Sequence, residues 1–343
     1  MIAQFFQKKL VLACILIAIC VGVFVVRMNN EQPSSLSLPV VAITQIAPHP
    51  SLDEIRRGIM DVLKEAGIMD DKILFQNAQG NTATALQIAQ KFISMRPKVI
   101  VPITTPSAQA AYKLSKEAGI PVIFSAVSDP YAAKLMPPQT VQGNTPVDIA
   151  GVSDLSPIKE QLDMIQKILP QAKTIGVLYN AGEANSNALV ALFTKDATLR
   201  GFTVIPATVM GTNNVTTSLA TLIGRVDAVY IPNDNTVISA IDSVLTFTRK
   251  HKLPLFTADP ESVKKGALAC VAYNQYDIGV TTGKMVVDFL KGMPLKDLGL
   301  KKPANVEFAL NKHTADSLNL SIPNDVRQKV TLHIVDGPRH RAH

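Results

Sequence analysis

Residues 99–130, VIVPITTPSAQAAYKLSKEAGIPVIFSAVSDP, decide the fold. An apolar run rich in β-branched residues opens the segment, a helical period that stops before Gly119 follows, and a second apolar run closes it. Near-continuous apolar strands are buried on both faces, which is typical of a parallel sheet covered by helices. Glycine ends the helix because it adopts the left-handed conformation at little cost. The segment therefore predicts one β–α–β unit.

A second segment, residues 228–260 (AVYIPNDNTVISAIDSVLTFTRKHKLPLFTADP), repeats this plan. Each segment has a proline near the end of its first strand and closes with an Asp-Pro pair. The two prolines are 28 residues apart in both cases, at Pro102 and Pro130 and at Pro232 and Pro260. In both, another proline introduces the second strand. This ordered match predicts an α/β protein with two similar lobes, each built on a doubly wound parallel sheet.

The same alternation of apolar runs and helical periods extends both units. The expected strands are residues 40–44, 73–76, 99–104, 122–127, 174–179, 203–208, 228–231 and 254–257. The expected helices are residues 52–66, 82–95, 107–118, 185–200, 216–223 and 236–251.

The composition is that of a packed globular protein. The 343 residues suffice for two cores, and 47% apolar with 18% charged residues excludes a disordered chain. The net charge is +7, of which +3 lies in residues 1–28, where Lys8, Lys9 and Arg27 have no acidic neighbour. No basic stripe with interleaved aromatic residues occurs, so we do not expect a nucleic-acid partner.

The N-terminal residues 1–28 are expected to be a signal or anchor segment. Residues 10–26 form an unbroken apolar run behind Lys8 and Lys9, and Cys14 lies in a poor context for lipoprotein processing. An uncleaved inner-membrane anchor and a cleaved export signal both fit, and we favour the anchor because no A-x-A-like site follows. The polar residues 29–38 predict a linker. We therefore expect a periplasmic, or otherwise extracytoplasmic, protein tethered to the inner membrane.

Motifs of common catalytic and nucleotide-binding sites are absent. The sequence has no G-x-x-x-x-G-K-[ST], G-x-G-x-x-G, G-x-S-x-G or H-E-x-x-H. Cys270 is the only cysteine outside the apolar run and is expected to be a buried strand residue. The isolated histidines are expected at the surface or hydrogen-bonded within the fold; they are His49, His251, His313 and His333. The sequence thus predicts no enzyme, cofactor or metal site.

Polar side chains follow the expected strands at the edge where parallel sheets bind ligands. Helices begin directly after most of them, so backbone N–H groups and positive helix ends point to the same place. Such a set suits a small molecule with a carboxylate and an ammonium group. The candidates are Gln45, Gln79, Gly80, Asn81, Thr104, Thr105, Ser128, Asp129, Asn180, Asn233, Asp234 and Asn235.

Six motifs at these positions occur in a familiar order: TPSAQAA (105–111), IPVIFSAVSDP (120–130), GVSDLSP (151–157), IGVLYNAGEANS (175–186), DAVYIPNDNTV (227–237) and GALA (266–269). Through them, residues 40–325 resemble the ABC-transporter substrate-binding proteins of the tryptophan/tyrosine type, which have the type I periplasmic binding protein fold. The resemblance implies Rossmann-like lobes joined by a three-stranded hinge. The implied lobes are residues 39–150 plus about 275–302, and residues 151–274 plus about 303–335.

The resemblance also implies a function and a site. The exported protein would bind a small zwitterion, an amino acid and possibly an aromatic one, in the interlobe cleft and pass it to an ABC permease and its ATPase. The residues that would line the cleft are Gln45, Thr105, Ser107, Asp129, Asn180, Glu183, Asn185, Ser186, Asp234 and Asn235. We expect the Asp234 carboxylate to accept the ligand's ammonium.

Simpler roles also fit these residues. Helix capping alone explains Asp234 and Asn185, a turn explains Asp129, and Glu183 fits a solvated surface position. Two other functions are compatible with the sequence as well: a membrane-tethered sensory domain that signals to a partner, and a doubly wound enzyme. A neighbouring kinase or cyclase gene would favour the first, and turnover of a bound ligand would be required for the second.

Overall fold

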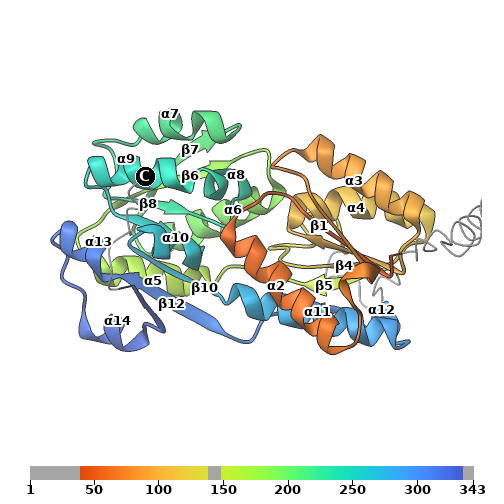
Figure 1. Ribbon diagram of the computed structural model, residues 1–343. Helices are drawn as coiled ribbons and strands as arrows, with labels where there is room; N and C mark the ends of the chain where they lie inside the picture. The colour runs from red at the N-terminus through yellow and green to blue at the C-terminus, as the bar shows by residue number, and fades with distance from the viewer. Residues whose placement is uncertain (1–38, 138–147, 335–343) are drawn as a thin grey trace, which may run out of the picture. The chain divides into compact units, whose positions relative to one another are not determined.

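The computed structural model describes residues 39–137 and 148–334, and the account below concerns this part of the chain (Figure 1). The expected anchor at residues 10–26 and the linker at residues 29–38 lie outside the described residues. Among the described residues, no helix has the length and apolar character needed to cross a membrane.

The first lobe is built on a sheet of six parallel strands in the order β11-β5-β4-β3-β1-β2. Its strands are β1 (Val41–Gln45), β2 (Ile73–Asn77), β3 (Val99–Ile103), β4 (Val122–Phe124), β5 (Ile149–Val152) and β11 (Leu300–Lys301). Its helices are α2 (Pro50–Glu65), α3 (Thr82–Met95), α4 (Thr105–Ala118), α11 (Gln275–Leu290) and α12 (Leu295–Leu298).

The second lobe has a seven-stranded sheet in the order β13-β12-β10-β9-β8-β6-β7, in which β12 runs antiparallel to β10. Its strands are β6 (Thr174–Asn180), β7 (Thr203–Val209), β8 (Ala228–Ile231), β9 (Leu255–Thr257), β10 (Ala269–Tyr273), β12 (Val306–Asn311) and β13 (Leu332–Ile334). Its helices are α5 (Ile158–Ile168), α6 (Ala184–Leu199), α7 (Val215–Ala220), α8 (Asn235–Ser239), α9 (Ile241–Lys250), α10 (Pro260–Lys265), α13 (Lys312–Ser317) and α14 (Asn324–Lys329).

Both faces of the second sheet are covered by apolar cores. Successive residues of β8 alternate between them: Ala228 and Tyr230 belong to one buried cluster, whereas Val229 and Ile231 belong to the other. Cys270 is buried in β10, as predicted. The uninterrupted apolar runs of the sequence thus correspond to parallel strands that are buried on both faces.

The chain crosses between the lobes three times among the described residues: after β5, after β10, and between β11 and β12. After the second crossing, α11 returns to the first lobe and packs closely against α2. Gly279 and Gly58 permit this contact, because a Cβ atom on Gly279 would lie 2.0 Å from the carbonyl oxygen of Ile55. The predicted architecture of two Rossmann-like lobes joined by a hinge is confirmed.

Several local boundaries differ from expectation, and two of the differences are described here. The helix expected at residues 236–251 is divided into α8 and α9 at Ala240, whose N–H donates to the Val237 carbonyl three residues back. The strand expected at residues 122–127 ends as β4 at Phe124, followed by a single bridge between Ser125 and Ile103.

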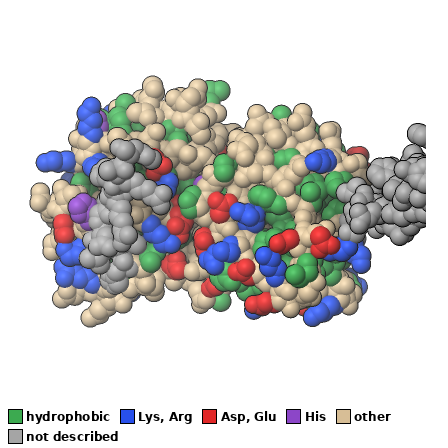
Figure 2. All heavy atoms as spheres, in the orientation of Figure 1, with side chains coloured by type: hydrophobic (Ala, Val, Ile, Leu, Met, Phe, Trp, Pro, Cys, Tyr) green, Lys and Arg blue, Asp and Glu red, His purple; other side chains and the backbone are tan. Residues whose placement is uncertain are grey.

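The surface shown in Figure 2 carries charges of both signs. Acidic and basic side chains are interspersed where α2 and α11 lie in Figure 1, and Arg57 forms an ion pair with Glu54 on α2. Charges mixed in this way contribute to solubility and create no large field of one sign on this face.

Candidate functional site

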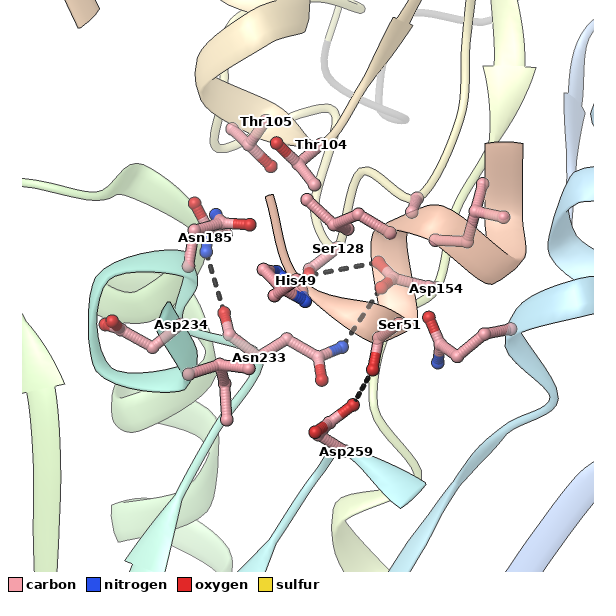
Figure 3. Close-up of a pocket in the computed structure, with 16 residues that line it drawn as sticks. His49, Ser51, Thr104, Thr105, Ser128, Asp154, Asn185, Asn233, Asp234 and Asp259 are labelled. Atoms are coloured by element: carbon pink, nitrogen blue, oxygen red, sulfur yellow. Dashed lines mark hydrogen bonds between the residues drawn. The ribbon is translucent and has the colours of Figure 1, made fainter. Parts of the chain in front are cut away.

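A small cavity lies between the lobes, at the carboxyl ends of the strands (Figure 3). It contains about 440 Å³ of unfilled space, counted with its open mouth. The first crossing segment contributes Asp154, and both lobes contribute the remaining residues. These are His49, Ser51, Leu52, Ile55, Thr104, Thr105, Ala126, Ser128 and Gln275 on the first-lobe side, and Asn185, Asn233, Asp234, Asn235, Ile238 and Asp259 on the second-lobe side.

The first-lobe wall contains the N-terminus of α4. Thr104 and Thr105 line the cavity (Figure 3), and the buried hydroxyl of neither has a hydrogen-bond partner within the described chain. Thr104 has a φ of 76°, a backbone conformation that is costly for a β-branched residue and typically occurs at functional sites. The positive end of α4 and these free hydroxyls together form a potential anion-binding site.

Asp154 connects the lobes at their first crossing. Its carboxylate accepts a hydrogen bond from Ser128 Oγ of the first lobe, at 3.1 Å, and another from Asn233 Nδ2 of the second lobe, at 3.0 Å. Burial raises the pKa of Asp154 to about 6, because the charged form loses hydration that these two donors only partly replace. A carboxylate has acceptor capacity for further donors, so Asp154 remains available to a ligand.

The expected residue Asp234 forms the N-cap of α8. Its Oδ1 accepts from the backbone N–H of Val237 at 2.8 Å, and its Oδ2 accepts from Asn180 N–H and Ser186 Oγ, both at 2.6 Å. Burial and the nearby charge of Glu183 raise the pKa of Asp234 above its usual range. Asp234 thus lines the cavity, and at the same time three protein donors hold its carboxylate.

Glu183, which directly precedes α6, also binds the N-terminus of α8. It is buried, and its carboxylate accepts from the backbone N–H groups of Asn235 and Thr236 as well as from their side chains. Asn185 donates to the Asn233 carbonyl at 2.8 Å, while its own Oδ1 has no partner in the described chain. This network keeps the α8 N-terminus and the cavity wall in place.

The structure brings four of the expected site residues into the cavity lining: Thr105, Asn185, Asp234 and Asn235. Asn180, Glu183 and also Asn235 line a wider adjoining groove between the lobes. Ser186 lies behind Asp234, and Ser107 and Gln45 are buried without lining either space. Asp129 forms a turn, in which its Oδ1 accepts from Tyr131 and Ala132 N–H groups, both at 2.9 Å.

Several lining residues follow strands that were expected in the sequence, namely Thr104, Ser128 and Asn233. Others were missed as site residues: His49, Ser51, Asp154, Asp259 and Gln275. Two of them directly follow strands, since Asp154 comes after β5 and Asp259 after β9. Applying the strand-end rule to the expected strand at residues 254–257 would have identified Asp259, whereas no strand was expected at residues 149–152.

The expectation for His49 was wrong. Its ring is not at the surface, since its exposed fraction is 8%, and neither ring nitrogen makes a hydrogen bond of ordinary geometry in the described chain, although the Asn235 side chain lies close to it. Burial lowers the pKa of His49, and the nearby carboxylates of Asp259, Asp53 and Glu183 oppose that effect only in part.

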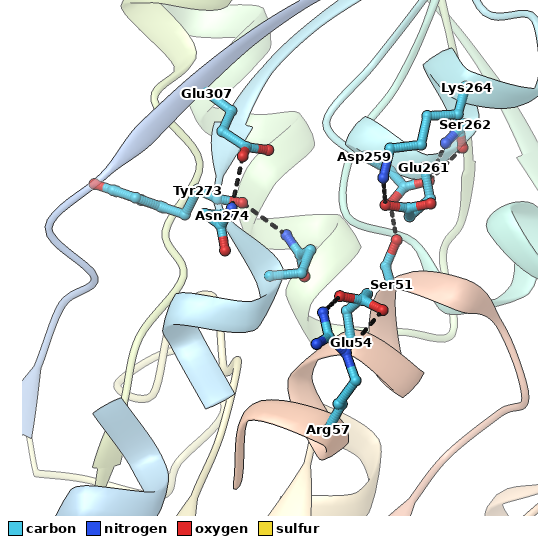
Figure 4. Close-up of polar contacts among 11 residues, drawn as sticks. Ser51, Glu54, Arg57, Asp259, Glu261, Ser262, Lys264, Tyr273, Asn274 and Glu307 are labelled. Atoms are coloured by element: carbon cyan, nitrogen blue, oxygen red, sulfur yellow. Dashed lines mark hydrogen bonds and ion pairs between the residues drawn. The ribbon is translucent and has the colours of Figure 1, made fainter. Parts of the chain in front are cut away.

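The two lobes touch directly at the edge of the cavity. Ser51, at the start of α2, donates through Oγ to the carboxylate of Asp259 in the second lobe (Figure 4). Asp259 is at the same time the N-cap of α10, where it accepts from the N–H of Ser262 at 2.8 Å. The lobes are therefore held together by side chains on both sides of the cavity.

The family model described as "ABC transporter substrate binding protein" matches residues 40–334. The chain belongs to this family. It is 32% identical over 295 residues to a protein named "Tyrosine-binding protein" from Clostridioides difficile, a match that covers 85% of this chain and 84% of the relative. Proteins of this family are extracytoplasmic solute-binding proteins.

Two solved structures of similar identity differ in how well they match this substrate-binding protein. A structure from Streptococcus pneumonia in complex with L-Trp is 33% identical, covers 86% of this chain and all of its own, and has a TM-score of 0.80. A ligand-free, open structure of a substrate-binding protein from Clostridium difficile is 34% identical, covers 87% of this chain and 99% of its own, and has a TM-score of 0.64. The arrangement of the lobes therefore resembles the ligand-bound relative more closely, in agreement with their direct contacts.

Proposed function

We propose that this protein binds a free amino acid with an aromatic side chain in the interlobe cavity and presents it to an ABC permease and its ATPase. The observation that carries the proposal is the polarity of the cavity, which has free hydroxyls at a helix N-terminus on one wall and buried carboxylates on others. Among the described residues, no lysine or arginine lines it. Such a site is complementary to a zwitterion.

The ligand carboxylate is assigned to the α4 end of the cavity. Thr104 and Thr105 supply hydroxyl donors there, and the helix dipole favours negative charge at its N-terminus. A carboxylate bound at this end would satisfy hydroxyls that have no other partner in the described chain.

The ligand ammonium is assigned to Asp154 rather than to Asp234. Asp234 already accepts three hydrogen bonds that maintain α8, whereas Asp154 accepts two side-chain bonds, one from each lobe. An ammonium on Asp154 would also link ligand binding to lobe closure, because Asp154 contacts both lobes only when they are close together.

The ligand side chain is assigned to the apolar part of the lining, formed by Leu52, Ile55, Ala126 and Ile238. Apolar walls with a few oriented polar groups are typical of amino-acid-sized ligands. The aromatic class is supported by the relative named for tyrosine and by the neighbour solved with L-Trp.

Calorimetric titration with L-tyrosine and L-tryptophan tests this function, with L-alanine as the ligand that lacks an aromatic group. We expect Asp154→Asn to weaken binding by ~30-fold to several thousandfold, because truncating one partner of a buried charged pair typically costs ~2–5 kcal/mol. The matched control is Asp297→Asn, since Asp297 is exposed on α12. Undiminished binding by Asp154→Asn would contradict the assigned ammonium site, and recovery of a chemically altered ligand would contradict a purely binding role.

We further propose that residues 10–26 tether the protein to the inner membrane. The support is the apolar run behind Lys8 and Lys9. Fractionation of cells that express the full chain should place it with the inner membrane, and a version starting at residue 29 behind a cleavable signal should be released. A native N-terminus near Met28 would contradict tethering.

A further inference from the structure

His49 occupies a helix-capping position without acting as a cap. It is the N-cap residue of α2, yet its side chain makes no capping hydrogen bond. Other N-cap residues of this chain use their side chains in this role, among them Asn81, Asp259, Asn274 and Asn311. His49 therefore stabilises the N-terminus of α2 less than Asn or Asp would, because the side chains of those residues accept a hydrogen bond from a free N–H group.

The His49 ring is instead part of the cavity lining. It is more than nine-tenths buried, and Figure 3 draws it amid the lining residues, between Asp234 and Asp154 in the view. Neither Nδ1 nor Nε2 makes a hydrogen bond of ordinary geometry in the described part of the chain, although the Asn235 side chain lies close enough to the ring to raise its pKa slightly. A buried imidazole with both nitrogens unpaired is costly, and each unsatisfied group of this kind requires an explanation.

The charges that face His49 are all negative. They are Asp53 on α2, Glu183 before α6, Asp259 at the cap of α10, and the cavity carboxylates Asp154 and Asp234. They attract any cation that enters the cavity, either a ligand ammonium or the proton of an imidazolium.

We propose that neutral His49 contacts the bound amino acid, with an unprotonated ring nitrogen accepting a hydrogen bond from the ligand's ammonium group. This rests on the proposed function and adds a specificity residue to it. The imidazole accepts only in its neutral form, since an imidazolium has donors alone and would repel the ammonium. Protonation of His49 and ligand binding therefore exclude each other.

A pH dependence with a definite sign follows. The buried ring in the closed cavity has a pKa below 6.5, while opening of the lobes returns water to the ring and restores the pKa toward its ordinary value. The open, ligand-free state therefore binds the proton more tightly. Lowering the pH below about 6.5 favours that state and weakens ligand binding, by up to tenfold per pH unit for one proton.

The experiment compares wild type with His49→Asn by calorimetric titration of L-tyrosine and L-tryptophan at pH 8 and pH 5. Asn is uncharged at both pH values and is a good N-cap, so we expect a melting temperature equal to or above that of wild type. At pH 8 the variant should bind ~10- to 100-fold more weakly, the loss expected for a hydrogen bond to a charged group. At pH 5 the two dissociation constants should converge.

The ratio of the variant's dissociation constant to that of wild type is the decisive quantity, because both proteins contain Asp154 and Asp234. His313→Asn is the matched control, since His313 is exposed on α13. A ratio near one at pH 8, or a ratio that does not fall toward one at pH 5, would overturn the role of His49 and leave the proposed function in place. Failure of wild type to bind either amino acid at pH 8 would overturn the proposed function, and this role with it.

Discussion

At the residue scale, the cavity assigns different roles to two buried aspartates that follow strands. Asp234 maintains α8 through three protein donors, whereas Asp154 connects the lobes and keeps acceptor capacity. We expect Asp234→Ala to lower the melting temperature by several degrees, because it leaves buried donors unsatisfied at ~1–3 kcal/mol each. Melting curves check this, with Asp297→Ala as the exposed control. An unchanged melting temperature would show that the cap is dispensable.

The raised pKa of Asp154 makes a separate prediction for the ligand-free protein. Its folded-state pKa of about 6 lies above the ordinary 3.8, so its contribution to stability is complete below pH 3.8 and is lost as the pH rises through 6. Asp154→Asn imitates the protonated form. The variant should match wild type near pH 4 and exceed it by up to about 3 kcal/mol at pH 7, at about 1.4 kcal/mol per pKa unit.

Chemical denaturation at both pH values checks this prediction, with Asp297→Asn as the control. If the stability difference between the variant and wild type were the same at pH 4 and pH 7, ionisation of the buried Asp154 carboxylate would not destabilise the fold. The expected result, higher stability with weaker ligand binding, is typical of residues that serve function at the expense of the fold.

At the element scale, the sequence determines most helices because their signals are local. The helix at residues 82–95 was predicted with both its boundaries, and Asn81 caps it as its position suggests. The division at Ala240 has no such signal, since alanine is the best helix former, and it depends on how α8 and α9 pack. Tertiary packing is the part of the fold that periodicity leaves open.

The candidate site shows the same limit. Thr105 and Asp234 could be predicted because each lies within three residues of the end of a strand at the ligand-binding edge, whereas Asn185 was expected only through the family resemblance. His49 could not, since it follows β1 by four residues and reaches the cavity only through the path of the connection to α2. Residues placed by loops and by contacts between lobes leave no regular period in the sequence.

The packing of α2 against α11 depends on residues without side chains. A Cβ atom on Gly279 would lie 2.0 Å from the Ile55 carbonyl oxygen, so Gly279→Ala must force the helices apart. Overpacking of this kind costs ~1–3 kcal/mol or more, and we expect a lower melting temperature. Lys284→Ala, on the exposed side of α11, is the control and should leave the protein as stable as wild type. A Gly279→Ala protein as stable as the control would contradict the close contact.

At the scale of the whole described body, the Ser51–Asp259 hydrogen bond holds the lobes together without help from a ligand. Ser51→Ala removes it and leaves the Asp259 carboxylate with its α10 partners. We expect the ratio of open to closed molecules to rise ~10- to 100-fold, because that is the effect of losing a hydrogen bond to a charged group. Small-angle scattering of the ligand-free protein should then show a larger radius of gyration, which L-tyrosine reverses.

The control for this experiment is Ser94→Ala, because Ser94 bonds only to the Lys91 carbonyl on the exposed face of α3. If wild type and Ser51→Ala had equal radii of gyration, both with and without ligand, the Ser51–Asp259 bond would not influence closure of the lobes.

The pairing of α2 with α11 also determines when the protein can fold. The chain emerges from the ribosome N-terminus first, and α2 is complete at Glu65 while α11 begins only at Gln275. At 5–20 residues per second, synthesis of the intervening chain takes roughly 10–40 s. Throughout that time the part of α2 that packs on α11 lacks its partner and is accessible to chaperones. For an extracytoplasmic protein this delay is useful, since the chain stays incompletely folded for most of its synthesis and remains competent for export through a narrow channel.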